Sequence, residues 1–427
     1  MAHSAVFDRA YVRRRNALLA PLLADLQPHY SAAEQAALRV VGTPPAALLQ
    51  TRGQGFVNCD ALETLLGNLL ELVAPGSHNV RAGGARAQPL RWALAAVADQ
   101  LYAAVRQSLA AADEAEDGGE RALHTTFALL HALPDLRRRS LWNRFASLRD
   151  PAVWDAYLVR QCRLPPERVA EIDFVAELEA AIRSRDMEHY RAFMRDLGCE
   201  RLVEYQLRLV TATYPGWRVL LYHDVAHALA ASAAPAANGR LAALPVPFLP
   251  RAIAELGGRY YQADLHPETR VGDANFLDHP HRGITTGQTG SIGSGCHLLP
   301  CTMGGLSEKV QQRHPLVGDF VFIGTDVGLF GSVRIGDGCV IGPNTEIHGR
   351  VEVGARCHIG ASAFVGTIWS GGTRPGRIVL GEGVRVGAGT ILENGSQLDL
   401  VIPAGAEIPA RSYVTNDGFG RPQYMRG

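Results

Sequence analysis

Two different spacings of hydrophobic residues divide the chain near residue 256. Up to that point, apolar residues recur at steps of three and four, the spacing that places them on one face of an α-helix. Segments with this spacing are 61–73, 90–109, 121–133, 175–197 and 219–231. We therefore predict an α-helical N-terminal domain over residues 1–256, most of which serves packing and oligomerisation.

Aliphatic residues recur every six positions in the second part of the chain. Nine successive positions of this series, from Val317 to Val365, are aliphatic, and seven of the nine are followed directly by Gly. The same step precedes this run at Leu265, Val271 and Leu277 and resumes after it at Leu380, Val386, Leu392 and Leu398. An α-helix cannot use a period of six, whereas a coil of three short strands turns one aliphatic of each strand inward. The pattern predicts an α+β protein with a left-handed parallel β-helix of hexapeptide repeats over residues 257–427.

Composition narrows the possible partners and the compartment. Among the 427 residues, 42 Lys and Arg balance 42 Asp and Glu, so neither nucleic acid nor an anionic membrane is expected as a partner. The seven cysteines are scattered without a CxxC pair, which is typical of a reducing cytoplasm. The N-terminus does not read as a signal peptide, and no apolar stretch of about 18 residues predicts a membrane span. We therefore expect a cytoplasmic protein.

Two interruptions of the six-residue step are candidate functional regions, because functional residues tend to lie where a regular scaffold is broken. The first runs from Leu277 to Val317, and the second is the loop at 367–377. The motifs in and before the first interruption are Asp264-Leu265-His266-Pro267, Phe276-Leu277-Asp278-His279, Gly287-Gln288-Thr289, Thr302-Met303-Gly304-Gly305 and Arg313-His314-Pro315.

These motifs, in this order, resemble the DIHP, LDHxTG, GET, TLGG and RHP motifs of the serine O-acetyltransferases, a hexapeptide-repeat acyltransferase family. The resemblance is strongest over residues 214–366. It implies transfer of an acetyl group from acetyl-CoA to L-serine, giving O-acetyl-L-serine for cysteine biosynthesis, with no bound cofactor. Hexapeptide-repeat proteins are commonly trimers, so a homotrimer or a dimer of trimers is expected.

The resemblance also implies roles for individual residues. His279 matches the catalytic histidine, and an imidazole suits a general base because its pKa lies near 7. Asp264 matches the carboxylate that orients this imidazole, and His314 matches a second active-site histidine that can stabilise an oxyanion. Arg313 is expected to bind the substrate carboxylate, and Asp278 its ammonium group.

The acyl donor is expected to lie against small residues that allow close approach of its pantetheine arm. Gly304, Gly305, Gly324 and Thr325 stand where the family lines this arm. In the second interruption, Arg374 and Arg377 are candidate contacts for the CoA phosphates. No metal ligand is expected in this reading.

Some positions depart from the family pattern. Gln288 replaces the Glu of GET, and the family's Asp from the helical domain has no clean counterpart, with Asp196 and Glu200 only near the expected place. The family's C-terminal Ile, which binds cysteine synthase, is replaced by Tyr424-Met425-Arg426-Gly427, which argues against that complex.

Three alternatives remain open from the sequence. The first is an acyl-CoA-dependent acyltransferase whose acceptor is a different hydroxy amino acid or an amine. A zinc enzyme like the γ-class carbonic anhydrases would need three histidines, for which His279, His281, His314, His348 and His358 offer nitrogens. The third alternative is a non-catalytic scaffold built on a degenerate acyltransferase.

Overall fold

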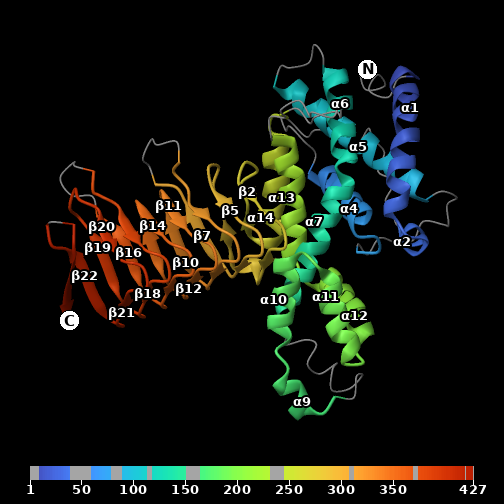
Figure 1. The fold of residues 1–427 in the computed structure, drawn as a ribbon. Helices are drawn as coiled ribbons and strands as arrows, with labels where there is room; N and C mark the ends of the chain where they lie inside the picture. The colour runs from blue at the N-terminus through green and yellow to red at the C-terminus, as the bar shows by residue number, and fades with distance from the viewer. Residues whose placement is uncertain are drawn as a thin grey trace. The chain divides into compact units, whose positions relative to one another are not determined.

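A helical region followed by a parallel β-helix makes up the computed structural model, which confirms the predicted fold class (Figure 1). The structure describes residues 9–38, 59–77, 89–112, 118–150, 164–230, 245–306, 312–368, 374–418 and 420–426. The chain forms two compact units, one of residues 1–140 and 218–257, the other of residues 141–217 and 258–427.

The first unit is helical, and its apolar stripes are buried as their spacing predicts. Its helices are α1 (Arg9–Leu26), α2 (Ala32–Ala37), α4 (Cys59–Val73), α5 (Pro89–Ala111), α6 (Gly118–His131), most of α7 (Leu133–Ala146), most of α13 (Gly216–Ala230) and most of α14 (Leu249–Tyr261). Leu94, Val97 and Leu101 of α5 have no exposed surface, and Phe127 of α6 has none either. No described helix is long and apolar enough to span a membrane.

The second unit contains the helices α9 (Pro166–Glu171), α10 (Phe174–Ser184), α11 (Met187–Asp196) and α12 (Glu200–Thr213). The segment 175–197, predicted to be helical, forms two helices, because Arg185 adopts a left-handed conformation with φ of 57° and ends α10. Asp186 then caps α11 by accepting a hydrogen bond from the Glu188 N–H.

The helical segment of this unit packs on the first coils of the β-helix. The Asn143 side chain accepts a hydrogen bond of 3.0 Å from the Asn275 N–H, and the buried Arg149 guanidinium donates one of 2.9 Å to the Gly295 carbonyl. Gly216 lies so close to the Leu277 carbonyl that a Cβ would overlap it. Helical residues that precede the predicted domain boundary at 256/257 thus pack with the β-helix in one compact unit. The division into two domains at this boundary stays a prediction.

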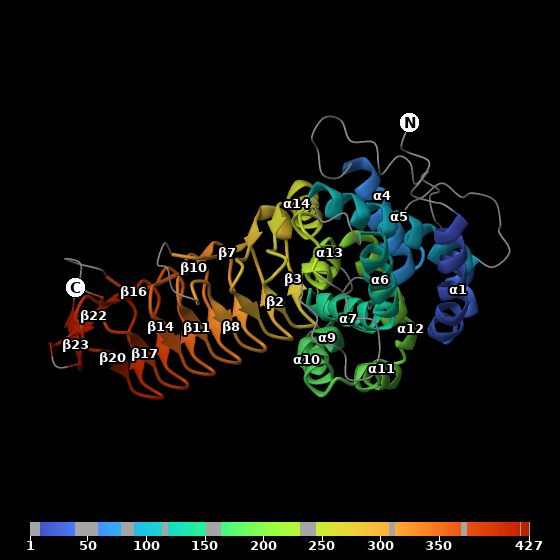
Figure 2. The ribbon, with the colours of Figure 1, turned by 90° about the horizontal axis from the view of Figure 1, so that it is seen from above.

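Three parallel sheets form the sides of the β-helix, and in each sheet the strands of successive coils stack side by side (Figure 2). Sheet A contains β1 (Ala263–Asp264), β4 (Ile284–Thr285), β7 (Cys301–Gly304), β10 (Val327–Phe330), β13 (Glu346–His348), β16 (Phe364–Thr367), β19 (Ile391–Asn394), β22 (Ser412–Asn416) and the antiparallel β23 (Pro422–Arg426). Sheet B contains β2 (Arg270–Val271), β5 (Ser291–Ile292), β8 (Leu316–Val317), β11 (Val333–Ile335), β14 (Val351–Val353), β17 (Ile378–Leu380) and β20 (Leu400–Ile402). Sheet C contains β3 (Phe276–Leu277), β6 (His297–Leu298), β9 (Phe322–Ile323), β12 (Val340–Ile341), β15 (His358–Ile359), β18 (Arg385–Val386) and β21 (Glu407–Ile408).

The predicted inward positions form the core of the β-helix. All nine aliphatic residues of the run from Val317 to Val365 are at most 4% exposed. The prediction that Leu398 continues the series is wrong, because this side chain is 48% exposed. Leu400 and Ile402 are buried instead, because residues between β19 and β20 form a loop that shifts the frame. The coil also continues through the first interruption, which contains β4 to β7.

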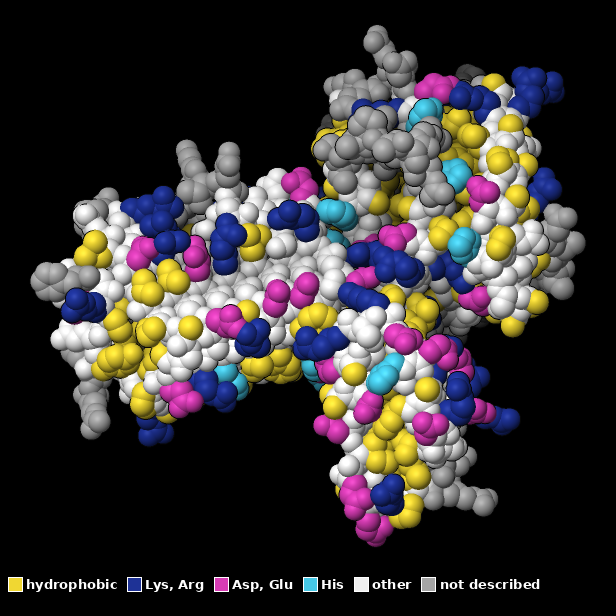
Figure 3. Space-filling model, viewed as in Figure 1, with side chains coloured by type: hydrophobic (Ala, Val, Ile, Leu, Met, Phe, Trp, Pro, Cys, Tyr) yellow, Lys and Arg dark blue, Asp and Glu magenta, His cyan; other side chains and the backbone are white. Residues whose placement is uncertain are grey.

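The surface of the β-helix mixes charges of both signs, as the balanced composition predicts (Figure 3). Arg356 pairs with Glu382, and Arg377 pairs with Glu352 and Asp399. The five cysteines with described side chains are buried free thiols.

The core column predicts a large difference between two isoleucines of the β-helix. Ile341 has no exposed surface, whereas the Ile391 side chain on the outside of sheet A is 42% exposed. Ile341→Ala should lower the free energy of unfolding by about 2–5 kcal/mol, because it leaves a cavity between stacked coils. Ile391→Ala should change it by less than about 0.5 kcal/mol. Urea unfolding of both variants measures this difference, and equal losses would contradict the core assignment.

Candidate active site

The first two coils carry a cluster of acidic and imidazole groups at the corner between sheets C and A. Asp278 follows β3, and its carboxylate lies between two imidazoles. Its Oδ2 is 3.3 Å from His297 Nε2, and its Oδ1 is 3.6 Å from His279 Nε2. The Asp278 side chain is 18% exposed, whereas that of His279 is 63% exposed. An open imidazole thus stands beside a largely buried carboxylate.

His279 occupies a strained position at this corner. Its backbone is left-handed, with φ of 48°, and the short helix η4 (Pro280–Arg282) follows directly. Its imidazole contacts Asp278 and the His281 ring, whose centroid is 5.7 Å away. The carboxylate that contacts this imidazole is thus that of the preceding residue. Asp264 lies on β1, which packs beside η4, so the two side chains belong to neighbouring segments.

A tyrosine and a second carboxylate extend this cluster. Tyr214, which ends α12, donates a hydrogen bond of 2.7 Å to Asp150 Oδ2. Burial raises the pKa of the Tyr214 hydroxyl, and the bond to Asp150 and the charge of Asp278 raise it further. Asp150 was not predicted from the sequence, because it is 64 residues from Tyr214 and no hydrophobic pattern marks it. The residues considered in its place, Asp196 and Glu200, are both exposed, and Glu200 pairs with Arg195.

The second cluster surrounds His314, at the corner between sheets A and B. Its Nδ1 lies 3.0 Å from Thr289 Oγ1 and accepts a hydrogen bond of 3.3 Å from the Thr289 N–H. Because Nδ1 accepts, the neutral imidazole carries its proton on Nε2. Burial lowers the pKa of His314, and the nearby charges of Arg313 and His266 lower it further. These effects favour the neutral form of His314, in which Nε2–H is a hydrogen-bond donor.

Two glycines leave room for the His314 ring. A Cβ on Gly287 would overlap the ring, and a Cβ on Gly305 would lie 2.9 Å from Nε2. Below them, Thr269 Oγ1 donates a hydrogen bond of 2.9 Å to the Gly287 carbonyl and contacts Thr286 Oγ1. The turn that carries Thr289 is thus held from the coil beneath it.

Gln288 links a cation and an anion beside His314. Its Nε2 donates a hydrogen bond of 2.7 Å to Glu268, and its Oε1 accepts one of 3.4 Å from Arg313 Nη2. A glutamate in this position would face Glu268 as a second negative charge, so the amide fits this chain. Glu268 and Gln288 help line a groove of about 320 Å³ whose other lining residues are Arg270, Thr289, Gly290 and Gln312.

The residues predicted for the acyl donor are spread along the outside of the coils. Gly304 is covered by the Phe330 ring, whose nearest atom is 2.8 Å from a Cβ built there, whereas Gly305 adjoins His314. Gly324 packs on the backbone of Pro343, which makes it a corner glycine. The buried Thr325 hydroxyl has no hydrogen-bond partner within the described part of the chain.

The second interruption is described only at its ends, since residues 369–373 lie outside the described residues. The Arg377 guanidinium is held by Asp399 at 2.7 Å and by Glu352 at 2.9 Å. These carboxylates raise the pKa of Arg377 and compete with phosphate groups for it. Arg374 is exposed.

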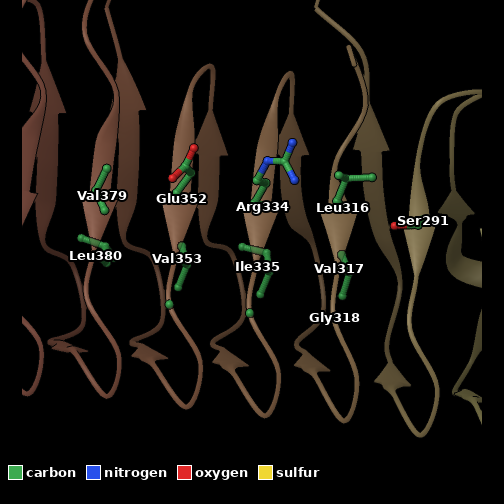
Figure 4. Close-up of a pocket in the computed structure, with 12 residues that line it drawn as sticks. Ser291, Leu316, Val317, Gly318, Arg334, Ile335, Glu352, Val353, Val379 and Leu380 are labelled. Atoms are coloured by element: carbon green, nitrogen blue, oxygen red, sulfur yellow. The ribbon is translucent and has the colours of Figure 1, made fainter. Parts of the chain in front are cut away.

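A larger groove lies on sheet B (Figure 4). It measures about 490 Å³ and is lined by outward side chains of successive strands, among them Leu316, Arg334, Glu352 and Val379. None of the predicted catalytic or substrate-binding residues lines it. Within the described ranges, no group of three or more His, Cys, Asp or Glu side chains is arranged to hold a metal ion.

The two clusters lie at opposite edges of sheet A. His279 stands where the chain passes from sheet C into sheet A, and His314 stands where it passes from sheet A into sheet B. The structure therefore joins His279 with Asp278, and His314 with Arg313, but does not bring these two pairs into contact within the described chain.

Comparisons with known proteins agree with the motifs. Residues 314–349 and 332–367 match the six-repeat model of the bacterial transferase hexapeptide. A serine acetyltransferase of Synechococcus elongatus is 30% identical over 129 residues, which are 30% of this chain and 48% of that protein. A probable serine acetyltransferase 3 of Oryza sativa is 36% identical over 142 residues, 33% of this chain and 41% of that protein. The chain thus spans less than half the length of these relatives.

Among solved structures, serine acetyltransferase isoform 3 of Entamoeba histolytica, in complex with cysteine, matches 92% of each chain with 17% identity and a TM-score of 0.45. The predicted resemblance is confirmed: the β-helix carries the bacterial transferase hexapeptide repeat, and the two relatives named above are serine acetyltransferases.

Proposed function

We propose that this chain is an acyl-CoA-dependent O-acetyltransferase that transfers the acetyl group of acetyl-CoA to L-serine. One observation carries the proposal. A single hexapeptide β-helix presents an open imidazole beside a carboxylate, at His279 and Asp278, and a neutral imidazole with a fixed N–H donor, at His314. These are the two functions that direct acyl transfer from a thioester requires, a base and an oxyanion donor.

The proposed reaction needs no covalent enzyme intermediate. The His279 imidazole takes the proton of the serine hydroxyl as its oxygen attacks the thioester carbon. The His314 Nε2–H donates a hydrogen bond to the oxyanion that forms. When the C–S bond breaks, the sulfur leaves and takes the proton from the His279 imidazolium, which yields free CoA and O-acetylserine. Asp264 is the carboxylate proposed to stabilise that imidazolium.

The charges around the two imidazoles match an amino acid. Asp278 and Asp150 lie in one cluster and can receive the ammonium group, while Arg313 can bind the carboxylate. Gly304, Gly305, Gly324 and Thr325 are proposed to lie along the pantetheine arm of acetyl-CoA. The buried Thr325 hydroxyl supports this placement, because a buried polar group without a partner is costly unless a ligand satisfies it.

The position of the clusters supports a site shared between copies of the chain. Because His279 and His314 stand at opposite edges of sheet A, a small substrate contacts both only where the His279 corner of one copy meets the His314 corner of another. A homotrimer with three equivalent grooves provides this arrangement. We therefore propose a homotrimer as the active form, alone or as a dimer of trimers.

The proposed base predicts a large loss of turnover in one variant and not in its control. Wild-type protein should release CoA thiol from acetyl-CoA in the presence of L-serine. His279→Ala should lower kcat by at least about 100-fold, because a positioned general base contributes about that much. His358→Ala, on the outside of sheet C, should leave kcat within about twofold. A thiol-release assay with a panel of amino acids measures this, and a rate within about threefold for His279→Ala would exclude His279 as the base.

The electrostatics of His314 predict a shift on removal of one charge. Burial and the positive charge of Arg313 both disfavour the imidazolium, so the pKa of His314 lies below its ordinary value. Arg313→Gln removes that charge and should raise the pKa of His314 toward the ordinary value. Histidine NMR titration measures the change, with Arg334→Gln on sheet B as the control. An unchanged or lower pKa in Arg313→Gln would contradict the proposed environment.

A further inference from the structure

A short aromatic ladder on the outside of sheet C holds an imidazole that the reaction scheme above does not use. His297 lies between Phe276 of the coil before it and Phe322 of the coil after it, each paired with it in the strand register. Its ring stacks on Phe276 with centroids 4.6 Å apart, and it meets the Phe322 ring edge-on at 5.1 Å. Both contacts fix the plane of the imidazole.

The fixed imidazole is directed at the carboxylate of the candidate site. His297 Nε2 lies 3.3 Å from Asp278 Oδ2, while Asp278 Oδ1 faces His279 at 3.6 Å. The His297 side chain is 23% exposed, compared with 63% for His279. The more buried imidazole therefore holds one oxygen of Asp278, and the other oxygen remains turned toward the open side of the cluster.

The orientation of Asp278 needs such a partner. The terminal torsion of an aspartate is broad, so its carboxylate does not adopt one orientation unless a neighbour fixes it. The Tyr214 hydroxyl, which also lies in this cluster, is bonded to Asp150 instead. Of the two imidazoles that contact the Asp278 carboxylate, His297 is the one whose ring packs against two phenyl rings.

We propose that His297 is a positioning residue that fixes the Asp278 carboxylate for the ammonium group of the amino-acid substrate. This inference rests on the proposed function, because it assigns Asp278 to substrate binding. His297 acts through Asp278 and does not touch the reacting atoms. Loss of the His297 hydrogen bond should therefore weaken amino-acid binding far more than it slows the chemical step.

Two substitutions separate this role from a purely structural one. His297→Phe keeps an aromatic ring between Phe276 and Phe322 but removes the nitrogen that faces Asp278. His297→Gln loses the ring but places an amide N–H near the position of Nε2. A structural role requires the ring, so it predicts that His297→Phe is harmless and His297→Gln is harmful. The positioning role predicts the reverse.

The test combines steady-state kinetics with calorimetric binding of L-serine to the full chain. For His297→Phe we expect a KM and a Kd for L-serine raised about tenfold, with kcat within about threefold. For His297→Gln we expect all three within about threefold of the wild type. His358→Phe, on the same outer face of sheet C, is the matched control and should resemble the wild type.

The outcomes distinguish the two proposals. If the wild type transfers acetyl groups to L-serine but His297→Phe leaves KM and Kd unchanged, or lowers only kcat, the positioning role is overturned and the proposed function stands. If the wild type neither binds an amino acid nor releases CoA, both proposals are overturned. A raised KM in His297→Phe that His297→Gln does not restore also overturns the positioning role.

Discussion

Stacking of like residues on like residues, coil upon coil, is the constraint on which the β-helix depends. Ile341, Ile359 and Val386 occupy paired positions of sheet C, and the first two have no exposed surface. A slip of one residue would turn these side chains outward and bury their polar neighbours, so the register is strongly specified. The register also determines where the corners of each coil lie. His279 and His314 are at such corners, so the register sets their positions although neither belongs to the core.

The first coils present backbone groups that no further coil can satisfy, and residues 141–150 cover part of them. Asn143 accepts from the Asn275 N–H, and Arg149 donates to the Gly295 carbonyl while Glu179 pairs with its guanidinium. Because a buried arginine needs such partners, this contact also fixes the end of the α7–η2 (Ser147–Arg149) region. Asp150 follows directly, which explains why the segment that covers the coils also brings a carboxylate to the candidate site.

The two imidazoles of the candidate site differ because their surroundings differ. The His279 side chain is 63% exposed and faces the Asp278 carboxylate. His314 is 8% exposed, accepts from a backbone N–H and lies near Arg313, all of which favour the neutral form. Near His314, the Gln288 amide donates a hydrogen bond to the Glu268 carboxylate and accepts one from the Arg313 guanidinium.

The sequence by itself determined the helical region, the six-residue coil and the identities of His279, His314, Asp278 and Arg313 as candidates, because periodic burial and ordered motifs are local in the chain. Only the tertiary structure decided which groups meet. It paired His279 with Asp278, brought Asp150 to Tyr214, and placed His297 against Asp278. It also turned Leu398 outward where the six-residue count predicted burial. These outcomes depend on contacts between distant segments and on loop lengths, which no repeat in the sequence encodes.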